Sequence, residues 1–302
     1  MANALRRVRV APKGMGLNDF VAHEDGYFAQ EGIEVYFDWK TFRGTQSSWK
    51  GTDYLSRPQD KPYTEAKDAG KNGGLIQCAC VWGSISNASA GMGRFVPDCY
   101  GVSPWAIYVR PESKIRRPED LKDVPVSVGI RAGSHFNVPY RLEKYLPLEH
   151  IKTVNTGGFG ARLKALLDGE VEAASLLPPQ IDMAEQLGLR KIMADEFHTL
   201  WWVPETAPLE DVRAYLRGLD RAEKALESNL EKYLPLWKIC IPADFEKMHP
   251  WDFTRFTRGE RFVYKPIPRT EFDEVMEQVK RWDLDQYLKE KSFDNLVYRA
   301  PA

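Results

Sequence analysis

Residues 7–37 read RVRVAPKGMGLNDFVAHEDGYFAQEGIEVYF, and this stretch decides the fold class. Residues 7–11 alternate between basic and apolar side chains, which predicts a first strand. We expect a helix over about 18–30 that is stopped by Gly32, followed by a second alternating strand over 33–37. Two strands joined through a helix make a βαβ unit, and such a unit needs a parallel sheet to cover.

The alternation of strands and helices continues along the chain. Further strands are expected at 75–82, 105–109, 126–130, 171–177, 191–193 and 198–203, and further helices at 138–144, 161–168, 182–187, 209–226 and 269–282. The sequence therefore predicts an α/β architecture with parallel-rich sheets. Ligands bind such sheets beyond the carboxyl ends of the strands. Site residues are therefore sought in segments that follow strands, such as a polar loop expected at 83–86.

Length and charge narrow the function classes. The chain has 302 residues, which suits two domains of roughly 150 residues each. Its net charge is -1, from 42 basic and 43 acidic residues, and no block of like charge stands out. This gives no electrostatic reason to expect a nucleic acid or a membrane surface as partner. No run of 18 apolar residues occurs, so no membrane span is expected.

The cysteines and the first residues bear on metals and location. Four cysteines occur without paired CxxC spacing and without a histidine cluster, so no structural metal is expected. Residues 1–7 lead directly into the first strand, with no apolar segment of a secretory signal, so a cytoplasmic protein is expected. A trimmed signal peptide would leave the same sequence and would place the protein in the periplasm.

Residues 22–35, AHEDGYFAQEGIEV, resemble the start of proteins with the type II periplasmic-binding-protein fold, in the nitrate, sulfonate and thiamine-pyrimidine-precursor group. Similar motifs follow in the group's order, as RPEDLKDVPVSVG at 117–129, ALLDGEVEAA at 165–174, TEFDEVM at 270–276 and FDNLV at 293–297. Together they cover most of the chain. The segment 46–71 departs from the group's pattern, so ligand contacts there are not carried over.

The resemblance implies a two-lobed fold with a ligand cleft between the lobes. Residues 1–106 and 201–302 are expected to form lobe I, and residues 107–200 lobe II. The cysteine-rich motif of the fungal pyrimidine-precursor synthases is absent, which counts against their chemistry.

Two arginines are candidates for holding an anionic ligand. Arg43 follows the strand at 33–37, and Arg131 follows the strand at 126–130. A guanidinium at such a position would face the cleft and bind a carboxylate through two parallel hydrogen bonds. The alternative for each is an ordinary surface arginine.

Two further candidates open the next helix. The backbone amides around Ser134, with its hydroxyl, form an anion-binding helix end, and the alternative is a plain N-cap. His135 is the histidine best placed for proton transfer, because its ordinary pKa lies near neutrality. The alternative for His135 is an exposed histidine without a role.

The remaining candidates are expected to line the cleft. Trp82, Ser84 and Asn87 belong to the end of a buried strand and its continuation. Gly158 belongs to the glycine-rich loop NTGGFG at 155–160, which brings backbone close to a ligand or is a required turn. Trp202 lies at the return crossover between the lobes, where one tryptophan ring is expected to stack on the ligand.

Three functions fit these residues. The sequence favours a cytosolic lyase of decarboxylase or dehydratase type, a use known for this fold, acting without a cofactor on a small anionic aromatic or heterocyclic compound. In that interpretation Arg43 and Arg131 hold the anion, and His135 transfers a proton. One alternative is the substrate-binding protein of an ABC-type importer, with a transporter permease as partner. The other is a cytosolic ligand sensor without chemistry, and a homodimer is compatible with all three.

Overall fold

The computed structural model describes residues 4–37, 75–89, 91, 93–129, 133–241, 243–281 and 288–299. Arg43 and Arg131 lie outside these ranges. Within the ranges, none of the helices is long and apolar enough to cross a membrane. No group of histidine, cysteine, aspartate and glutamate side chains in them is arranged to hold a metal ion.

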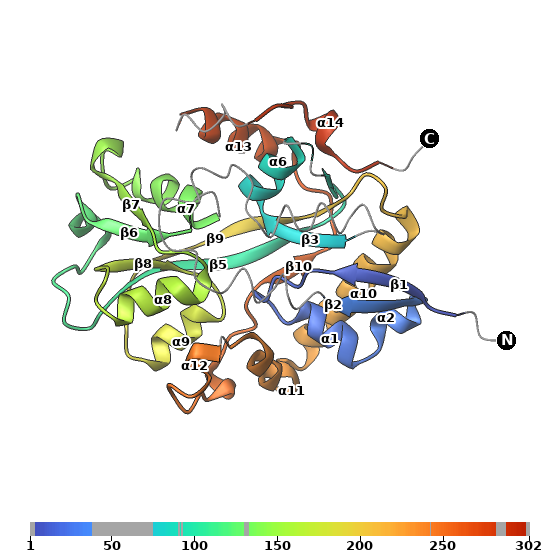
Figure 1. Ribbon diagram of the computed structural model, residues 1–302, viewed down its shortest axis with the longest axis horizontal. Coiled ribbons are helices and arrows are strands. Elements are labelled where there is room, and N and C mark those ends of the chain that lie inside the picture. The colour runs from blue at the N-terminus through green and yellow to red at the C-terminus, as the bar shows by residue number, and fades with distance from the viewer. Residues whose placement is uncertain are drawn as a thin grey trace.

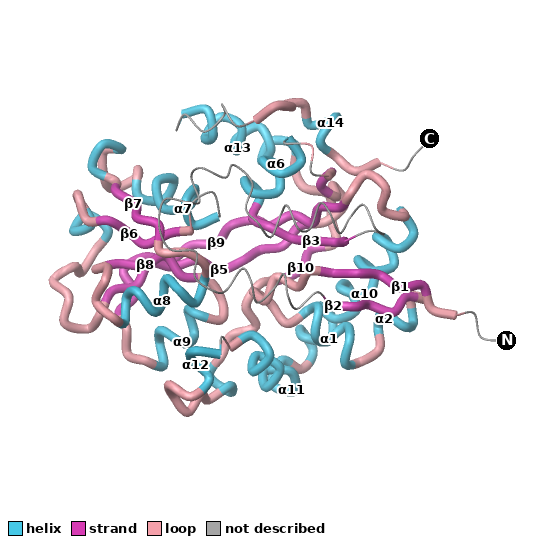
Figure 2. Tube along the Cα trace, viewed as in Figure 1, coloured by secondary structure: helices cyan, strands magenta, loops and turns pink. Residues whose placement is uncertain are grey.

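The described strands form one continuous sheet (Figures 1 and 2). The strands are β1 Arg6–Val10, β2 Ile33–Phe37, β3 Leu75–Cys80, β4 Arg94–Phe95, β5 Tyr100–Val109, β6 Pro125–Val128, β7 Lys152–Asn155, β8 Ala173–Leu176, β9 Arg190–Val203 and β10 Arg261–Val263. Their order across the sheet is β2-β1-β3-β9-β5-β8-β6-β7, with β10 paired to β5 and β4 paired to β9.

Helices cover both faces of this sheet (Figure 2). They are α1 Asn18–Glu24, α2 Tyr27–Gln30, α6 Val81–Ser89, α7 Gly133–Leu142, α8 Phe159–Leu167, α9 Gln180–Gln186, α10 Leu209–Ser228, α11 Leu230–Tyr233, α12 Ala243–Glu246, α13 Arg269–Arg281 and α14 Phe293–Leu296. The apolar side chains of α1, α8, α9 and α10 fill one buried cluster. Those of α6, α7, α13 and α14 fill a second cluster on the opposite face.

The βαβ unit predicted at the start of the chain is present. Strands β1 and β2 pair in parallel, with Val8 opposite Val35. The single helix expected over 18–30 is wrong in one respect, because Gly26 adopts a left-handed conformation with φ 72° and divides it into α1 and α2.

Two long antiparallel strands join the two lobes. β5 pairs with β10 at its start and with β8 at its end. β9 pairs with β5 along most of its length and with β3 at its end. β5 therefore leaves lobe I, which holds β1–β3, α1, α2 and α10, and enters lobe II, which holds β6–β8 and α7–α9, while β9 returns. The two-lobed α/β fold is confirmed, and the boundaries at 106/107 and 200/201 stay a prediction.

Two local expectations are wrong. Residues 191–193 and 198–203 are not separate strands, because backbone pairing with β5 continues through the polar residues Asp195 and Glu196 between them. Residues 81–86 are neither strand nor loop but the start of α6. The helix begins directly after β3 because the Gly83 N–H donates to the Cys80 Sγ at 3.2 Å, which satisfies one of its first amides.

Candidate functional site

The carboxyl ends of the strands from both lobes lie near the middle of the molecule (Figure 1). Gly133, the first residue of α7 in lobe II, touches Cys80, the last residue of β3 in lobe I. A Cβ placed on Gly133 would lie 2.8 Å from the Cβ of Cys80 and 3.5 Å from the ring of Phe197. This position therefore takes a glycine because the two lobes meet there.

On the lobe I side, a nearly buried lysine occupies the segment that follows β1. The Lys13 side chain is 10% exposed, and its Nζ donates to the Thr199 Oγ1 at 2.9 Å and to the Cys78 Sγ at 3.0 Å. It also forms an ion pair with Glu260. Burial opposes the charge of Lys13, but Cys78 and Glu260 more than offset this and raise its pKa above the ordinary value. The lysine is therefore charged, and Glu260 neutralises it.

The two cysteines of β3 are poor nucleophiles in this environment. Burial raises the pKa of Cys78 to about 12, although Lys13 lowers it in part. Burial likewise raises the pKa of Cys80 to about 12, against hydrogen bonds from backbone amides. Because the thiolate is the reactive form, both side chains are unreactive thiols at neutral pH.

On the lobe II side, the glycine-rich loop after β7 leads into α8. Gly157 has a left-handed φ of 107°, and its N–H donates to the Asn155 Oδ1 at 3.2 Å. Gly158 is the N-cap of α8, and no side chain among the described residues caps the first amides of this helix. The start of α8 therefore presents backbone N–H groups and the positive end of the helix dipole at the carboxyl edge of lobe II.

The first turn of α8 also carries a buried arginine. Arg162 is 1% exposed, and its Nε and Nη1 have no hydrogen-bond partner in the described part of the chain. Its guanidinium lies 5.2 Å from the centre of the Phe159 ring. Burial lowers the pKa of Arg162 to about 9, which leaves it charged at neutral pH. Gln180, the first residue of α9, is likewise fully buried, and neither atom of its amide has a partner there.

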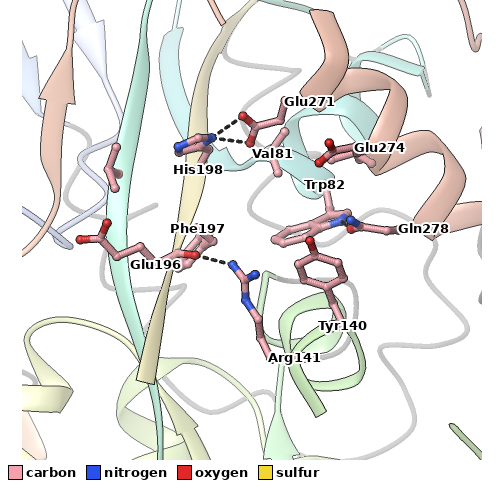
Figure 3. A pocket seen from close by; sticks show the side chains of 12 residues that line it. Val81, Trp82, Tyr140, Arg141, Glu196, Phe197, His198, Glu271, Glu274 and Gln278 are labelled. Atoms are coloured by element: carbon pink, nitrogen blue, oxygen red, sulfur yellow. Dashed lines mark hydrogen bonds and ion pairs between the residues drawn. The ribbon is translucent and has the colours of Figure 1, made fainter. Parts of the chain in front are cut away.

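A separate cavity of about 220 Å³ lies between α6, α7, α13 and the crossing strands (Figure 3). Arg141 lies on its wall and is already paired, since its Nε is 3.2 Å from Asp195 and its Nη2 donates to the Glu196 carbonyl. Glu271, whose carboxylate contacts the His198 Nδ1, and Glu274 approach from α13. The carboxylates make this cavity unfavourable for an anion, whereas the start of α8 is favourable.

Three predicted cleft residues from lobe I and the crossover are buried in the protein. The Trp82 ring stacks on Phe136 and donates from Nε1 to the Gln278 Oε1 at 3.0 Å, at the wall of the cavity in Figure 3. The Ser84 hydroxyl is within hydrogen-bond distance of two backbone carbonyls and has no exposed surface. Trp202 also has no exposed surface. In this conformation these three side chains contact protein.

Of the other predicted residues, some lie at the starts of helices, and the rest have side chains outside the described part of the chain. The Ser134 hydroxyl accepts from the Gly129 N–H at 2.9 Å, and His135 lies in the first turn of α7 against Phe136. Asn87 belongs to α6, and its side chain lies outside the described part. Gly158, together with Ser134 and His135, thus lies at the edge where the lobes meet. The ligand contacts assigned to all the predicted residues stay predictions.

Sequence reasoning missed Lys13, Arg162 and Gln180. For Arg162 a signal was present, because residues 159, 162, 163 and 166 fall on one face of a helix and the other three are apolar. Because the apolar face of a helix packs against the core, a charged residue on that face is buried when the chain folds. Lys13 carried no such signal, since its partner Glu260 is remote in the sequence.

Comparison with known proteins places the fold. No family model and no curated protein sequence matches the chain. Among solved structures, it is similar to the alkanesulfonate-binding protein SsuA from Xanthomonas axonopodis pv. citri bound to MOPS, with 15% identity, 99% of this chain and 100% of that chain covered, and a TM-score of 0.67. The periplasmic aliphatic sulphonate binding protein SsuA from Escherichia coli gives 14% identity, 98% coverage of both chains and a TM-score of 0.66.

An enzyme shares the same fold. The desulfurization enzyme DSZB gives 13% identity, 98% coverage of this chain and 96% of that chain, and a TM-score of 0.57. These identities are low, so the similarities establish the type II periplasmic-binding-protein fold and leave the function to the chemistry of the site.

Proposed function

We propose that the protein is the solute receptor of an ABC-type importer, and that its two lobes close on a small organic anion. The observation that carries the proposal is the meeting of the two lobes at their strand ends, where Gly133 lies against Cys80 and where, among the described strands, only β5 and β9 run from one lobe to the other. Two connecting strands of this kind permit hinge closure around a ligand. Coverage of nearly the whole chain by two alkanesulfonate-binding proteins supports this function.

The receptor is preferred to the lyase that the sequence favoured. Both thiols near the meeting point are held protonated by burial, and Lys13 is neutralised by Glu260. The described residues at this edge therefore supply a binding surface without an activated nucleophile. His135, the predicted proton carrier, keeps that role as a prediction, and the similarity to DSZB keeps the lyase testable.

The receptor function also changes the proposed location and partner. A receptor of an importer acts outside the cytoplasmic membrane, and the E. coli protein with this fold is described as periplasmic. We therefore favour the periplasmic alternative over the cytoplasmic location that the first residues suggested. The partner that follows is a transporter permease, which would dock on the closed form.

Mass spectrometry distinguishes the receptor from the lyase. The full chain would be incubated with a panel of alkyl and aryl sulfonates and carboxylates, and compounds that raise the melting temperature would be carried forward. A receptor returns each bound compound unchanged after prolonged incubation and denaturation. Catalytic conversion of a bound compound, at a rate lost in His135→Ala, would instead establish the enzyme.

Lobe closure gives an independent test. Small-angle scattering should show a smaller radius of gyration when a stabilising compound saturates the protein, because the lobes approach each other about β5 and β9. An unchanged radius with a saturating ligand would contradict a clamp.

A further inference from the structure

The buried guanidinium of Arg162 needs a counter-charge that the described protein does not provide. Its Nε and Nη1 have no partner among the residues that the structure describes, and burial lowers its pKa. A buried charge without a partner costs several kcal/mol of stability, so such residues are rare outside functional sites. The cost is offset if an anion reaches the site.

Several hydrogen-bond donors lie at the same carboxyl edge of lobe II as the start of α8. The start of α8 offers backbone amides that no side chain in the described ranges caps. Directly after β7, which precedes α8, and in the neighbouring β6, the Thr156 and Ser127 hydroxyls bond to each other, which uses one of their two protons and leaves the other to donate. Val126 and Val128 belong to the cluster under α7, so Ser127 between them points to the opposite face, where α8 packs.

Gln180 adds an amide at the same edge. It opens α9, which packs against α8 on the same face of the lobe II sheet. Both α8 and α9 begin directly beyond the carboxyl ends of their strands, β7 and β8. A buried amide with two unpaired atoms is unfavourable by itself, and a ligand that accepts from its nitrogen would remove part of that cost.

We propose that Arg162, Gln180 and the first amides of α8 bind the acid group of the ligand, and that this group carries one negative charge, as a sulfonate or a carboxylate does. The inference rests on the proposed function, since it concerns the ligand of the same cleft. It names the lobe II subsite and the charge of the group that occupies it.

The charge balance selects a monoanion. Lys13 on the lobe I side is already ion-paired with Glu260, whereas the Nε and Nη1 of Arg162 have no partner among the described residues, so Arg162 is matched by a single negative charge. A phosphate monoester carries a charge near -2 at neutral pH and would leave negative charge buried. A neutral amide or sulfonamide would leave the guanidinium unpaired. Both should bind more weakly than the matched acid.

The test compares three matched ligands on the full chain. Benzenesulfonate and benzoate serve as monoanions, phenyl phosphate as the dianion, and benzenesulfonamide and benzamide as neutral analogues. Isothermal titration and thermal shift should rank the monoanions first. In Arg162→Met, which removes the charge and keeps an apolar side chain, the dissociation constant of the monoanions should rise about 100-fold or more, while the neutral compounds lose less than about threefold.

The melting temperature of the ligand-free protein tests the role of Arg162 independently of which compound binds. Because Arg162→Met removes a buried charge without a partner, it should raise the melting temperature of the ligand-free protein. A structural arginine would give the opposite sign. Arg110 is the matched control at the other end of α8, where its Nη1 donates to the carbonyls of Leu166 and Val171 at 3.0 and 2.8 Å. Arg110→Met should lower the melting temperature and leave the dissociation constants unchanged.

The outcomes separate this inference from the receptor function. If Arg162→Met lowers the melting temperature as Arg110→Met does, or binds the monoanions as tightly as the wild type, the subsite is wrong while the receptor stands. The same holds if only dianionic compounds bind the wild type, whereas binding of neutral compounds alone would contradict both the subsite and the receptor of an organic anion. If the monoanions bind through Arg162 and are converted, the receptor is wrong while the subsite stands.

Discussion

Each lobe buries a cation at the edge where the lobes meet, and the two cations differ in whether protein groups pair with them. In lobe I, Lys13 bonds to Thr199 and Cys78 and is neutralised by Glu260. In lobe II, Arg162 is more deeply buried and its Nε and Nη1 have no partner in the described part of the chain. A paired buried cation is part of the fold, whereas an unpaired one is available to a ligand.

The difference follows from where the two residues are placed. Lys13 lies where segments from distant parts of the chain converge, and each contributes a group: Cys78 from β3, Thr199 from β9 and Glu260 from the residue before β10. Arg162 projects from a helix whose buried neighbours, such as Leu163 and Leu166, are apolar. Lobe I is therefore expected to be the pre-formed half of the site.

The largest effect is expected from removing the paired cation. Lys13→Met leaves the Glu260 carboxylate buried without its counter-ion, which should cost about 3–5 kcal/mol of unfolding free energy. Chemical denaturation measures this. The double variant Lys13→Met with Glu260→Gln should recover most of the loss, and equal instability of the single and double variants would show that the ion pair is not the cause.

A buried acid that links the lobes should give the next largest effect. Asp182 of α9 is 3% exposed and accepts from the Thr257 N–H at 3.0 Å. Burial raises the pKa of Asp182 from 3.8 to about 6, although Thr257 lowers it in part. Between these values the folded state holds a proton that the unfolded chain releases, so stability should fall as pH rises from about 4 to about 6.

Asp182→Asn isolates this contribution. Between pH 4 and 6 the unfolding free energy of the wild type should fall by an extra amount, on the order of 3 kcal/mol, that the variant lacks. Subtracting the two curves of unfolding free energy against pH gives this amount. Parallel curves for wild type and variant between pH 4 and 6 would contradict the burial of a titrating carboxyl at this junction.

A smaller effect is expected at the contact between the lobes. Gly133→Ala would place a Cβ 2.8 Å from the Cβ of Cys80, which should cost about 1–3 kcal/mol. Cys80→Gly removes the opposing Cβ. In the double variant Gly133→Ala with Cys80→Gly, the loss of stability should therefore be smaller than the sum of the losses in the two single variants. If Gly133→Ala is neutral in thermal denaturation, the two lobes are not in contact as described.

The smallest effect is expected from the helix start of α7. Ser134→Ala leaves the Gly129 N–H without its acceptor and should cost about 1 kcal/mol. Ser134→Thr keeps the hydroxyl and serves as the control for the hydrogen bond in the same thermal measurement. A larger loss in Ser134→Thr than in Ser134→Ala would mean that packing of the buried side chain, and not the bond, determines stability here.

Sequence alone predicted the regular parts of this fold. The strand at 33–37 and the helix at 269–282 agree with β2 and α13 to within a residue, because alternation and helical periodicity are local properties. The start of α6 was missed because Val81 and Trp82 extend the apolar run of β3. The hydrogen bond from the Gly83 N–H to the Cys80 Sγ, which marks the start of the helix, is not visible in the sequence.

The candidate site was predicted less well, for a physical reason. A sequence shows that Lys13 and Arg162 are basic, but the presence or absence of a partner depends on contacts between remote segments. Ser134 and Gly158 were placed at helix starts by local rules, and the structure has them there. The pairing of Lys13 and the lack of a partner at Arg162 are seen only in the folded chain.

The most direct test is the unfolding free energy of Arg162→Met and wild type, each without ligand and with saturating benzenesulfonate. We predict that the ligand-free variant is the more stable protein, and that the ligand stabilises the wild type according to its concentration over its dissociation constant while leaving the variant almost unchanged. A ligand-free variant that is less stable than the wild type, with equal stabilisation of both by the ligand, would contradict the assignment of lobe II as the anion-binding half.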